Sequence, residues 1–523
     1  MMKKLYIAIM SMAVALPSAA QETYENAKLA ENELNGTARY VGMGGAMEAL
    51  GADISTISSN PAGIGLFRKS YVGTSFSVVA QQDAASFSTG KKTTFSFDQA
   101  GFVYSSREGV NSYMNFAFNY HKSRNFNYIL SAADGLSNAS QNKLTYAKAK
   151  NGLLYEVDER TLVPNFDRPY AQCNQLDDIY ASNLNYDKVE NTWYAYGADD
   201  YTLNRAHKGY ISEFDFNLSG NINDRVYLGM TVGVHDVNYR HYGEYDEYTS
   251  GARKIQVADE RTIEGTGYDI KAGIIFRPIE ESALRFGLSV ASPTWYKLTS
   301  SNDTYITGSN NEGGLARSVN NNDSYEFKLY TPWKFGLSAG HTVGSMVAMG
   351  LSFEYADYSS MDTRKITGST YDWYYDSYSE SSTSDNDMNH HTESTLKGVA
   401  TLKAGVELKP APEMAVRLGY NYVSPMYEEE GFKDGTVASE GSYISSATDY
   451  TNWEATHRIT CGFGYSFGPL NLSMAYQYSM TNGNFRPFMN YVDNAVAADD
   501  NIAGNVKVSQ KRHQVMMTLG YSF

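Results

Sequence analysis

The sequence predicts an all-β protein: a closed, antiparallel transmembrane barrel of fourteen strands, with a hatch of short helices and loops in its lumen. Three observations lead to this prediction. They are an export signal, side chains that alternate between apolar and polar up to the terminal Phe523, and connections that alternate between short and long. Lipid outside and a polar lumen inside force such alternation, and closure leaves no unpaired strand edge in hydrocarbon.

The first twenty residues have the form of a secretory signal peptide. Lys3-Lys4 precede an apolar run from Leu5 to Leu16, and Ser18-Ala19-Ala20 supply small residues for cleavage. The run is too short for a membrane-spanning helix, which needs about 20 apolar residues. We therefore expect residues 1–20 to be a signal peptide, residues 21–68 to form the hatch, and residues 69–523 to form the barrel with long extracellular loops.

Composition agrees with an exported barrel. The 523 residues include 43 tyrosines and 44 glycines, 42% are hydrophobic, and the mean hydropathy is −0.44, which suits one lipid face, aromatic girdles and a polar interior. The formal net charge of −15 argues against a nucleic-acid partner, which needs a basic face. Cys173, in a long loop, and Cys461, on the predicted lipid side, form no disulfide framework. We expect neither a metal nor another cofactor.

Alternation and turn residues predict the strands in order. Their fourteen ranges are 70–80, 93–106, 112–128, 209–222, 225–241, 262–278, 283–299, 324–341, 345–360, 393–409, 413–426, 455–467, 469–481 and 507–523. The number is even, as single-chain bacterial barrels require.

The strand phase can be stated residue by residue. In the fifth strand the predicted lipid-facing residues are Val226, Leu228, Met230, Val232 and Val234. In the last strand they are Val515, Met517, Leu519, Tyr521 and Phe523.

The connections between strands alternate in length. Tight turns are expected at 223–224, 279–282, 342–344, 410–412 and Gly468. Long loops are expected at 129–208, 242–261, 300–323, 361–392, 427–454 and 482–506. Short turns face the periplasm in such barrels, so we expect both mature termini there. A soluble two-sheet sandwich predicts no such alternation.

Five strands share a pattern in which a basic residue and a glycine occupy successive inward positions. The pairs are Lys271 and Gly273, Arg285 and Gly287, Lys334 and Gly336, Lys403 and Gly405, and Arg417 and Gly419. One interpretation is that the cations pair with inward Asp269, Glu354 and Glu407 while glycine relieves crowding. The other is that the glycines make room for the hatch and that one or more cations bind an anionic ligand head group, because charge pairing is stronger in a low-dielectric lumen.

Residues 21–68 do not alternate and are rich in glycine and small side chains. They contain Arg39-Tyr40-Val41-Gly42 and Asn60-Pro61-Ala62; further along lie Ser292-Pro293-Thr294, Thr331-Pro332, Val416-Arg417-Leu418-Gly419-Tyr420 with Ser424-Pro425, and the aromatic C-terminus. In this order these motifs resemble the FadL/TodX family of outer-membrane transporters for long-chain fatty acids and other hydrophobic compounds.

The resemblance implies a monomeric barrel in the bacterial outer membrane, in contact with outer-membrane lipid and lipopolysaccharide. It implies passive uptake of a hydrophobic small molecule or fatty acid, which binds in a lumenal pocket beside the hatch and leaves through a gap at a kinked strand. Asn60, Pro61 and Ala62 match the hatch motif. The loop 129–208 is longer than the family pattern, and the sequence indicates no kink in the third strand.

Two other classes of function compete. An enzyme would need a nucleophile or acid motif, whereas the histidines here are scattered and lie in none, so we expect no enzyme. A role without transport remains open on the same fold, either as a protein shuttle or anchor like those of type IX secretion or as a surface-binding protein.

Overall fold

The computed structural model describes residues 22–150, 155–157, 164–169, 185–187, 189–190, 192–195, 197–249, 253–308, 319–374, 377–434, 437, 439, 447–492 and 496–523. Cys173 lies outside these residues. The barrel strands are β1 (Tyr71–Gln82), β2 (Thr93–Arg107), β3 (Tyr113–Asn125), β4 (Tyr128–Ala139), β9 (Ala198–Ile222), β10 (Val226–Thr249), β11 (Arg253–Phe276), β12 (Arg285–Ala291), β13 (Trp295–Gly308), β14 (Val319–Tyr330), β15 (Lys334–Val343), β16 (Val347–Asp357), β19 (Gly398–Ala411), β20 (Met414–Val423), β21 (Tyr450–Phe467), β22 (Leu470–Arg486) and β23 (Val506–Ser522). β17 (Asp362–Asp372) and β18 (Ser377–Ser384) belong to the same sheet but form a hairpin beside the barrel.

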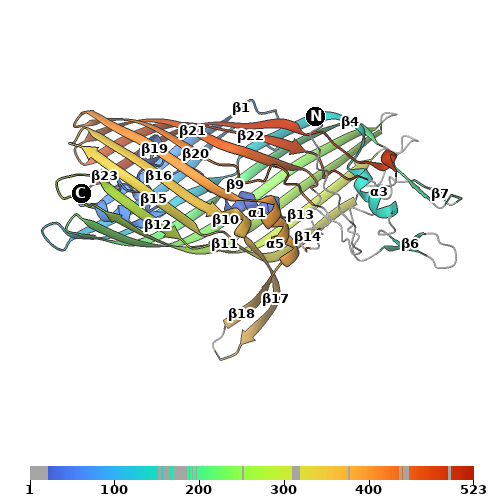
Figure 1. The fold of residues 1–523 in the computed structure, drawn as a ribbon, viewed down its shortest axis with the longest axis horizontal. Coiled ribbons are helices and arrows are strands. Elements are labelled where there is room, and N and C mark those ends of the chain that lie inside the picture. Colours follow the sequence, from blue (N-terminus) through green and yellow to red (C-terminus); the bar gives the residue numbers. More distant parts are fainter. Residues whose placement is uncertain are drawn as a thin grey trace, which may run out of the picture.

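The sheet closes on itself into one barrel (Figure 1). β1 pairs antiparallel with β23, with Tyr71 opposite Ser522. β3 and β4, β12 and β13, and β14 and β15 are successive parts of single crossings, so fourteen crossings are present in the described chain, as predicted.

The outer face carries an apolar band that confirms the predicted strand phase. Met230 is 53% exposed, whereas its inward neighbour Thr231 is fully buried. Leu519 and Cys461 are exposed on the same outer face. Because only lipid accommodates a continuous apolar band around a closed barrel, the protein is a multi-pass outer-membrane protein.

Among the described residues, no helix is long and apolar enough to cross a membrane.

The predicted long loops are partly wrong. Residues 242–249 and 253–261 continue the β10–β11 ladder, and most of 300–323 belongs to β13 and β14. Strands beyond the lipid need no apolar face, so their sequence does not alternate. The seventh and eighth strands are interrupted at 292–294 and 331–333, around Pro293 and Pro332, because proline cannot donate to a ladder.

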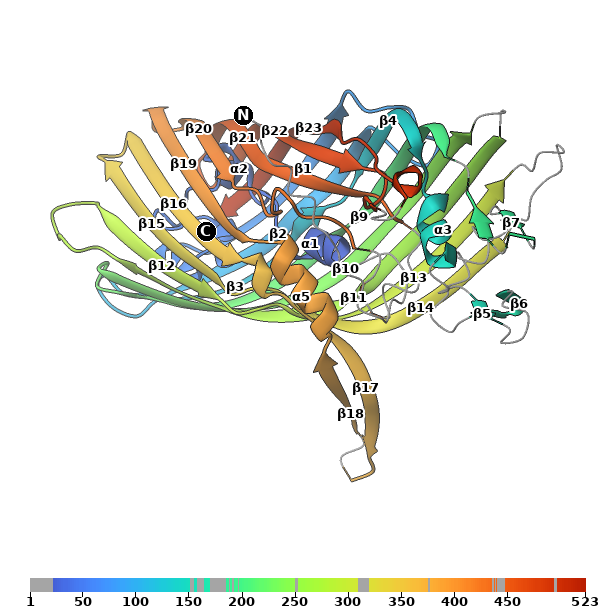
Figure 2. The ribbon, with the colours of Figure 1, turned by 45° about the vertical axis from the view of Figure 1, so that its right-hand side comes forward.

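Other connections fold into small elements. β5 (Tyr155–Val157) pairs with β6 (Pro164–Pro169), and β7 (Asn185–Asp187) pairs with β8 (Thr192–Tyr194). The helices are α3 (Asn142–Lys150), α5 (Asn386–Thr395), η3 (Tyr358–Ser360) and η4 (Ala497–Asp499). The β17–β18 hairpin projects sideways from the barrel, with α5 at its base (Figure 2).

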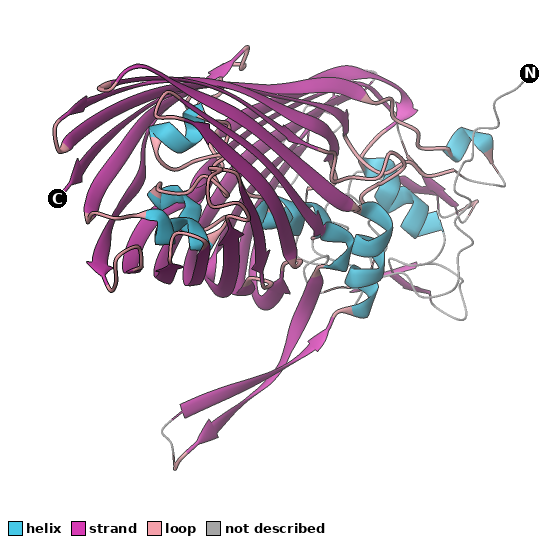
Figure 3. Ribbon diagram, turned by 60° about the vertical axis from the view of Figure 1, so that its left-hand side comes forward, coloured by secondary structure: helices cyan, strands magenta, loops and turns pink. Residues whose placement is uncertain are grey.

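The hatch comprises α1 (Thr23–Ala30), α2 (Ala38–Gly42), η1 (Ile54–Ile57) and η2 (Pro61–Leu66), and it lies inside the barrel (Figure 3). α1 packs against α5, in the connection between β18 and β19, where Thr23 Oγ1 lies 3.0 Å from Thr392 Oγ1. The described start of the hatch therefore lies inside the barrel and away from the short turns, whereas the expected mature N-terminus, Gln21, lies outside the described residues and its periplasmic position stays a prediction. A segment without residue alternation carries no information about which end of the lumen it occupies.

Candidate functional site

The hatch touches the barrel wall at the glycines of the repeated pattern. A Cβ added to Gly405 or Gly419 would overlap the Met43–Gly44 backbone, and one added to Gly273 would meet the Asn60 amide. One added to Gly287 would meet Ser338 Oγ of the wall first and the Asn60 amide as well. Gly336 is the exception, because its Cβ would meet the Ser289 side chain instead. Four of the five pattern glycines therefore make room for the hatch, as the second interpretation predicted.

The Asn60-Pro61-Ala62 motif holds the end of the hatch that lies near the short turns. Asn60 is extended and caps η2, since its Oδ1 accepts a hydrogen bond from Ala62 N at 3.2 Å. Pro61 begins the helix, where its missing N–H costs nothing, and its carbonyl accepts a 2.9 Å hydrogen bond from Ser219 Oγ. Ala62 is fully buried against Tyr227 of the wall. Any role of this motif in opening is a proposal.

The five cations of the pattern differ in their partners. Lys271, Lys403 and Arg417 form the ion pairs expected from the first interpretation, at 2.9 Å from Asp269, 3.7 Å from Glu354 and 2.6 Å from Glu407. Arg285 donates to the Leu50 carbonyl at 3.1 Å. Lys334 is paired in the sheet through its backbone, but its ammonium has no ion-pair or hydrogen-bond partner among the described residues. Structural ion pairing therefore accounts for three of the five cations.

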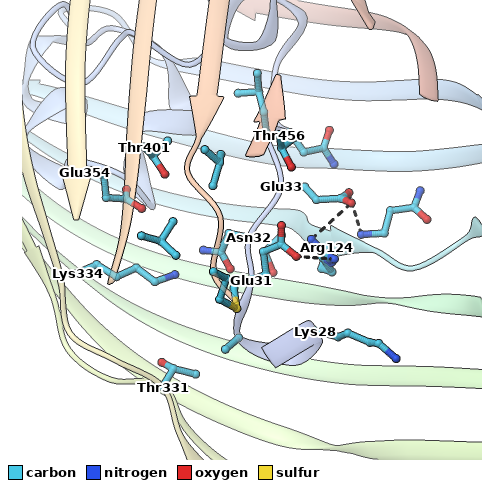
Figure 4. Close-up of a pocket in the computed structure, with 18 of the residues that line it drawn as sticks. Lys28, Glu31, Asn32, Glu33, Arg124, Thr331, Lys334, Glu354, Thr401 and Thr456 are labelled. Atoms are coloured by element: carbon cyan, nitrogen blue, oxygen red, sulfur yellow. Dashed lines mark hydrogen bonds and ion pairs between the residues drawn. The ribbon is translucent and has the colours of Figure 1, made fainter. Parts of the chain in front are cut away.

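A pocket lies in the lumen between the hatch and the wall (Figure 4). Its water-accessible volume is about 200 Å³, which exceeds the roughly 150 Å³ cavity known to hold benzene. Its lining mixes charged and aromatic side chains, among them Lys334, Glu354, Tyr239, Tyr427 and Trp453. The pocket therefore suits an amphipathic molecule better than a purely apolar one.

Two hatch carboxylates hold arginines of the wall at this pocket. Glu33 Oε1 lies 2.7 Å from Arg512 Nη1, and Glu31 Oε2 lies 2.9 Å from Arg124 Nη2. Burial alone would raise the pKa of Glu33, but Arg512 and Arg124 hold that pKa below its usual value. Arg458, which also lines the pocket, bonds Asn421 at 2.8 Å and pairs with no carboxylate in the described chain. We call the Glu31 and Glu33 contacts the latch.

Sequence analysis missed the latch. Glu31 and Glu33 belong to a segment without periodicity, and their partners lie on β3 and β23, more than ninety residues away. The only sequence signal was the acidity at the start of this segment, which carries Glu22, Glu25, Glu31 and Glu33.

The wall beside the pocket contains a seam between β2 and β3. The backbone ladder between the two strands ends at Gln99 and His121, so Thr93–Asp98 has no ladder partner on β3, although both segments are described. Side chains still cross this gap, since Lys122 Nζ donates to Ser96 Oγ at 3.1 Å. The register of β3 on β9 also shifts between Lys122 and Arg124, and the strand ends at Asn125. The third strand is therefore irregular, a feature that its sequence did not indicate.

The hatch bridges this seam. Asn35 Nδ2 donates to Asp98 Oδ1 on β2 at 3.2 Å and to the Lys122 carbonyl on β3 at 3.1 Å. Asn35 and Ser123 also line the pocket. Pocket, hatch and seam thus meet at one place in the wall.

Barrel, hatch and pocket together define an outer-membrane barrel with a plugged lumen. No protein-family model matches the sequence, and no curated protein matches it. Similar solved structures include the Ralstonia pickettii toluene transporter TbuX (11% identity, TM-score 0.47), a Pseudomonas aeruginosa FadL homologue (12%, 0.49) and the Pseudomonas putida toluene transporter TodX (9%, 0.46). Each match covers 94% of this chain and 99% of the other. Two of these structures carry the names of the family that the sequence motifs resemble.

Proposed function

We propose that this protein takes up hydrophobic compounds with a polar head, such as long-chain fatty acids, through its lumenal pocket. The observation that carries the proposal is that one pocket touches the hatch and the seam together. A molecule bound there has a route sideways into the outer leaflet, which avoids returning its acyl chain to water at a cost of about 0.8 kcal/mol per CH₂.

The charges of the pocket suit a carboxylate head group. Neither Lys334 nor Arg458 has a carboxylate within ion-pair distance in the described chain, and both line the pocket. A ligand carboxylate near Arg512 would also compete with Glu33 for that guanidinium. Binding would then loosen the latch and, through Asn35, the bridge across the seam.

The proposal is tested in a host that lacks its own fatty-acid channel. Cells that display the protein should accumulate radiolabelled oleate faster than cells that display a Lys334→Met variant, whereas Lys334→Arg should retain uptake. In the purified protein, Lys334→Met should weaken binding of oleate but not of oleyl alcohol. Absence of uptake by correctly folded, surface-displayed protein would overturn the proposal, and equal loss of both ligands would overturn the head-group role.

A further inference from the structure

A second cluster of charged side chains lies in the lumenal wall, apart from the latch. Glu213 and Asp215 come from β9, His235 from β10, and Asp269 and Lys271 from β11. All five residues are at least nine-tenths buried. The Lys271 ammonium contacts Glu213 and lies 3.2 Å from Asp215 Oδ1 and 2.9 Å from Asp269 Oδ1.

The charges of this cluster do not balance. Three carboxylates face one ammonium, and no other lysine or arginine forms an ion pair with them in the described chain. His121 lies 3.4 Å from Glu213 Oε2 and 3.5 Å from Asp215 Oδ2, and His235 lies 3.1 Å from Asp269 Oδ2. Two of the three carboxylates therefore need a shared proton, a charged histidine or a metal ion, because an uncompensated buried charge is costly. One divalent cation would neutralise the cluster.

The geometry around His235 supplies the second observation. Its Nε2 has no hydrogen-bond partner among the described residues, although it lies 3.1 Å from Asp269 Oδ2 and 3.9 Å from Glu213 Oε1. Tyr296 Oη lies 3.5 Å from the other ring nitrogen, Nδ1. A proton on Nδ1, directed at that hydroxyl, leaves the Nε2 lone pair facing the two carboxylates, as in histidines that bind metals.

The distances agree with a transition-metal site. Zinc binds histidine nitrogen and carboxylate oxygen at about 2.0–2.2 Å, so ligand atoms of a tetrahedral site lie roughly 3.3 Å apart. The ligand atoms of Glu213, His235 and Asp269 lie within 4.8 Å of one another. Movements of about 1 Å or less would bring them to that spacing, and a fourth position would remain open towards the pocket, which these residues line.

We propose that Glu213, His235 and Asp269 bind one divalent transition-metal ion of the Zn²⁺ class in the wall of the lumenal pocket. The proposed metal site is separate from the latch. The result of an uptake assay therefore does not test whether the site binds metal. Its place in the barrel gives it a structural consequence. A bound ion would tie β9, β10 and β11 together from the inside, close to the point where β2 and β3 separate at His121, because His121 Nε2 lies 3.4 Å from Glu213 Oε2.

The test uses the full-length protein without a histidine tag, purified in detergent and freed of metal with a chelator. Titration with Co²⁺ should give the visible absorption bands of a tetrahedral site at one ion per chain, and Zn²⁺ should abolish them. His235→Ala and Asp269→Asn should each weaken Co²⁺ binding at least tenfold. His207→Ala is the matched control, because His207 is an equally buried lumenal histidine that bonds Tyr239 rather than a carboxylate, and it should bind like the wild type.

Two results would overturn the assignment. One is wild-type protein that binds no Co²⁺ above a detergent blank, which would leave protonated histidines as the source of charge balance. The other is His235→Ala that retains wild-type affinity, for instance because the ion sits with His121, Glu213 and Asp215 instead. Heat-modifiable migration on gels shows whether each variant is folded. If one of them is not folded, His235→Gln is used in its place. Lys271→Met should bind the ion more tightly, since it removes the competing ammonium.

Discussion

The seating of the hatch gives the sharpest prediction. A Cβ added to Gly419 would lie 2.2 Å from Gly44 N, more than 1 Å short of the 3.4 Å at which ordinary contact begins. The obstacle is backbone, so no side-chain rotation relieves it. Gly419 itself has no positive φ, and alanine therefore fits the strand. Gly419→Ala should act only by pushing the hatch away from the wall.

The expected size of the effect of Gly419→Ala follows from the cost of overpacking in other proteins, which is about 1–3 kcal/mol. If the clash is relieved by movement of the hatch away from the wall, the fraction of molecules with a displaced hatch should rise roughly 5- to 150-fold. Hydrogen exchange of residues 38–50 should accelerate by that factor while barrel strands stay protected. Ion conductance in planar bilayers should rise in parallel.

Gly336→Ala is the matched control. It belongs to the same pattern, but its Cβ would meet the Ser289 hydroxyl, which can rotate away. The reasoning is refuted if residues 38–50 exchange as in the wild type in Gly419→Ala, or if both variants accelerate exchange equally.

Other predictions concern the two ends of the hatch. Asn60→Ala removes the cap on Ala62 N and should destabilise η2 by about 1 kcal/mol, seen as faster exchange of residues 57–66 with unchanged heat-modifiable migration; an unaltered rate would make the motif incidental. At the other end, burial lowers the pKa of His391 in α5 to about 4, so undocked α5 binds the proton more readily. The docking of α5 is then at its most stable above pH 6.5. Its free energy should weaken by up to about 3 kcal/mol as the pH falls towards 4. Protection of residues 386–395 should drop over this range in the wild type but not in His391→Asn; equal drops in both would contradict the assignment.

Much of the barrel could be predicted because its physics is local in sequence. Lipid on one face imposes a period of two, so Met230 and Leu519 face outwards as expected. The same reasoning failed for residues 242–261, where β10 and β11 rise beyond the lipid and nothing forces alternation. It also failed to indicate the irregular third strand, since pairing depends on neighbours that a single strand does not reveal.

The candidate site was less accessible to sequence reasoning. The repeated lysine or arginine with glycine correctly located the wall that receives the hatch, because only glycine permits that approach. Which cations are paired could not be read from the pattern. Lys271 meets Glu213 and Asp215 from a different strand, whereas Lys334 meets no acid in the described chain. Such differences depend on which residues of the neighbouring strands lie opposite each cation, and the sequence of one strand does not reveal them.

The length of the central strands has a consequence for how selectivity can arise. β10 has 24 residues, which extend roughly 80 Å and, at a tilt of about 40°, rise roughly 60 Å along the barrel axis. The lipid band takes up only about 25 Å of this height. The outward aliphatic residues of β10 end at Val234, and the pocket-lining His235 and Tyr239 follow. The part of the barrel beyond the lipid is thus a continuous hydrogen-bonded sheet. It is too stiff to change shape around each arriving molecule. Discrimination between molecules must then occur deeper, at the pocket, where the latch joins the hatch to the wall.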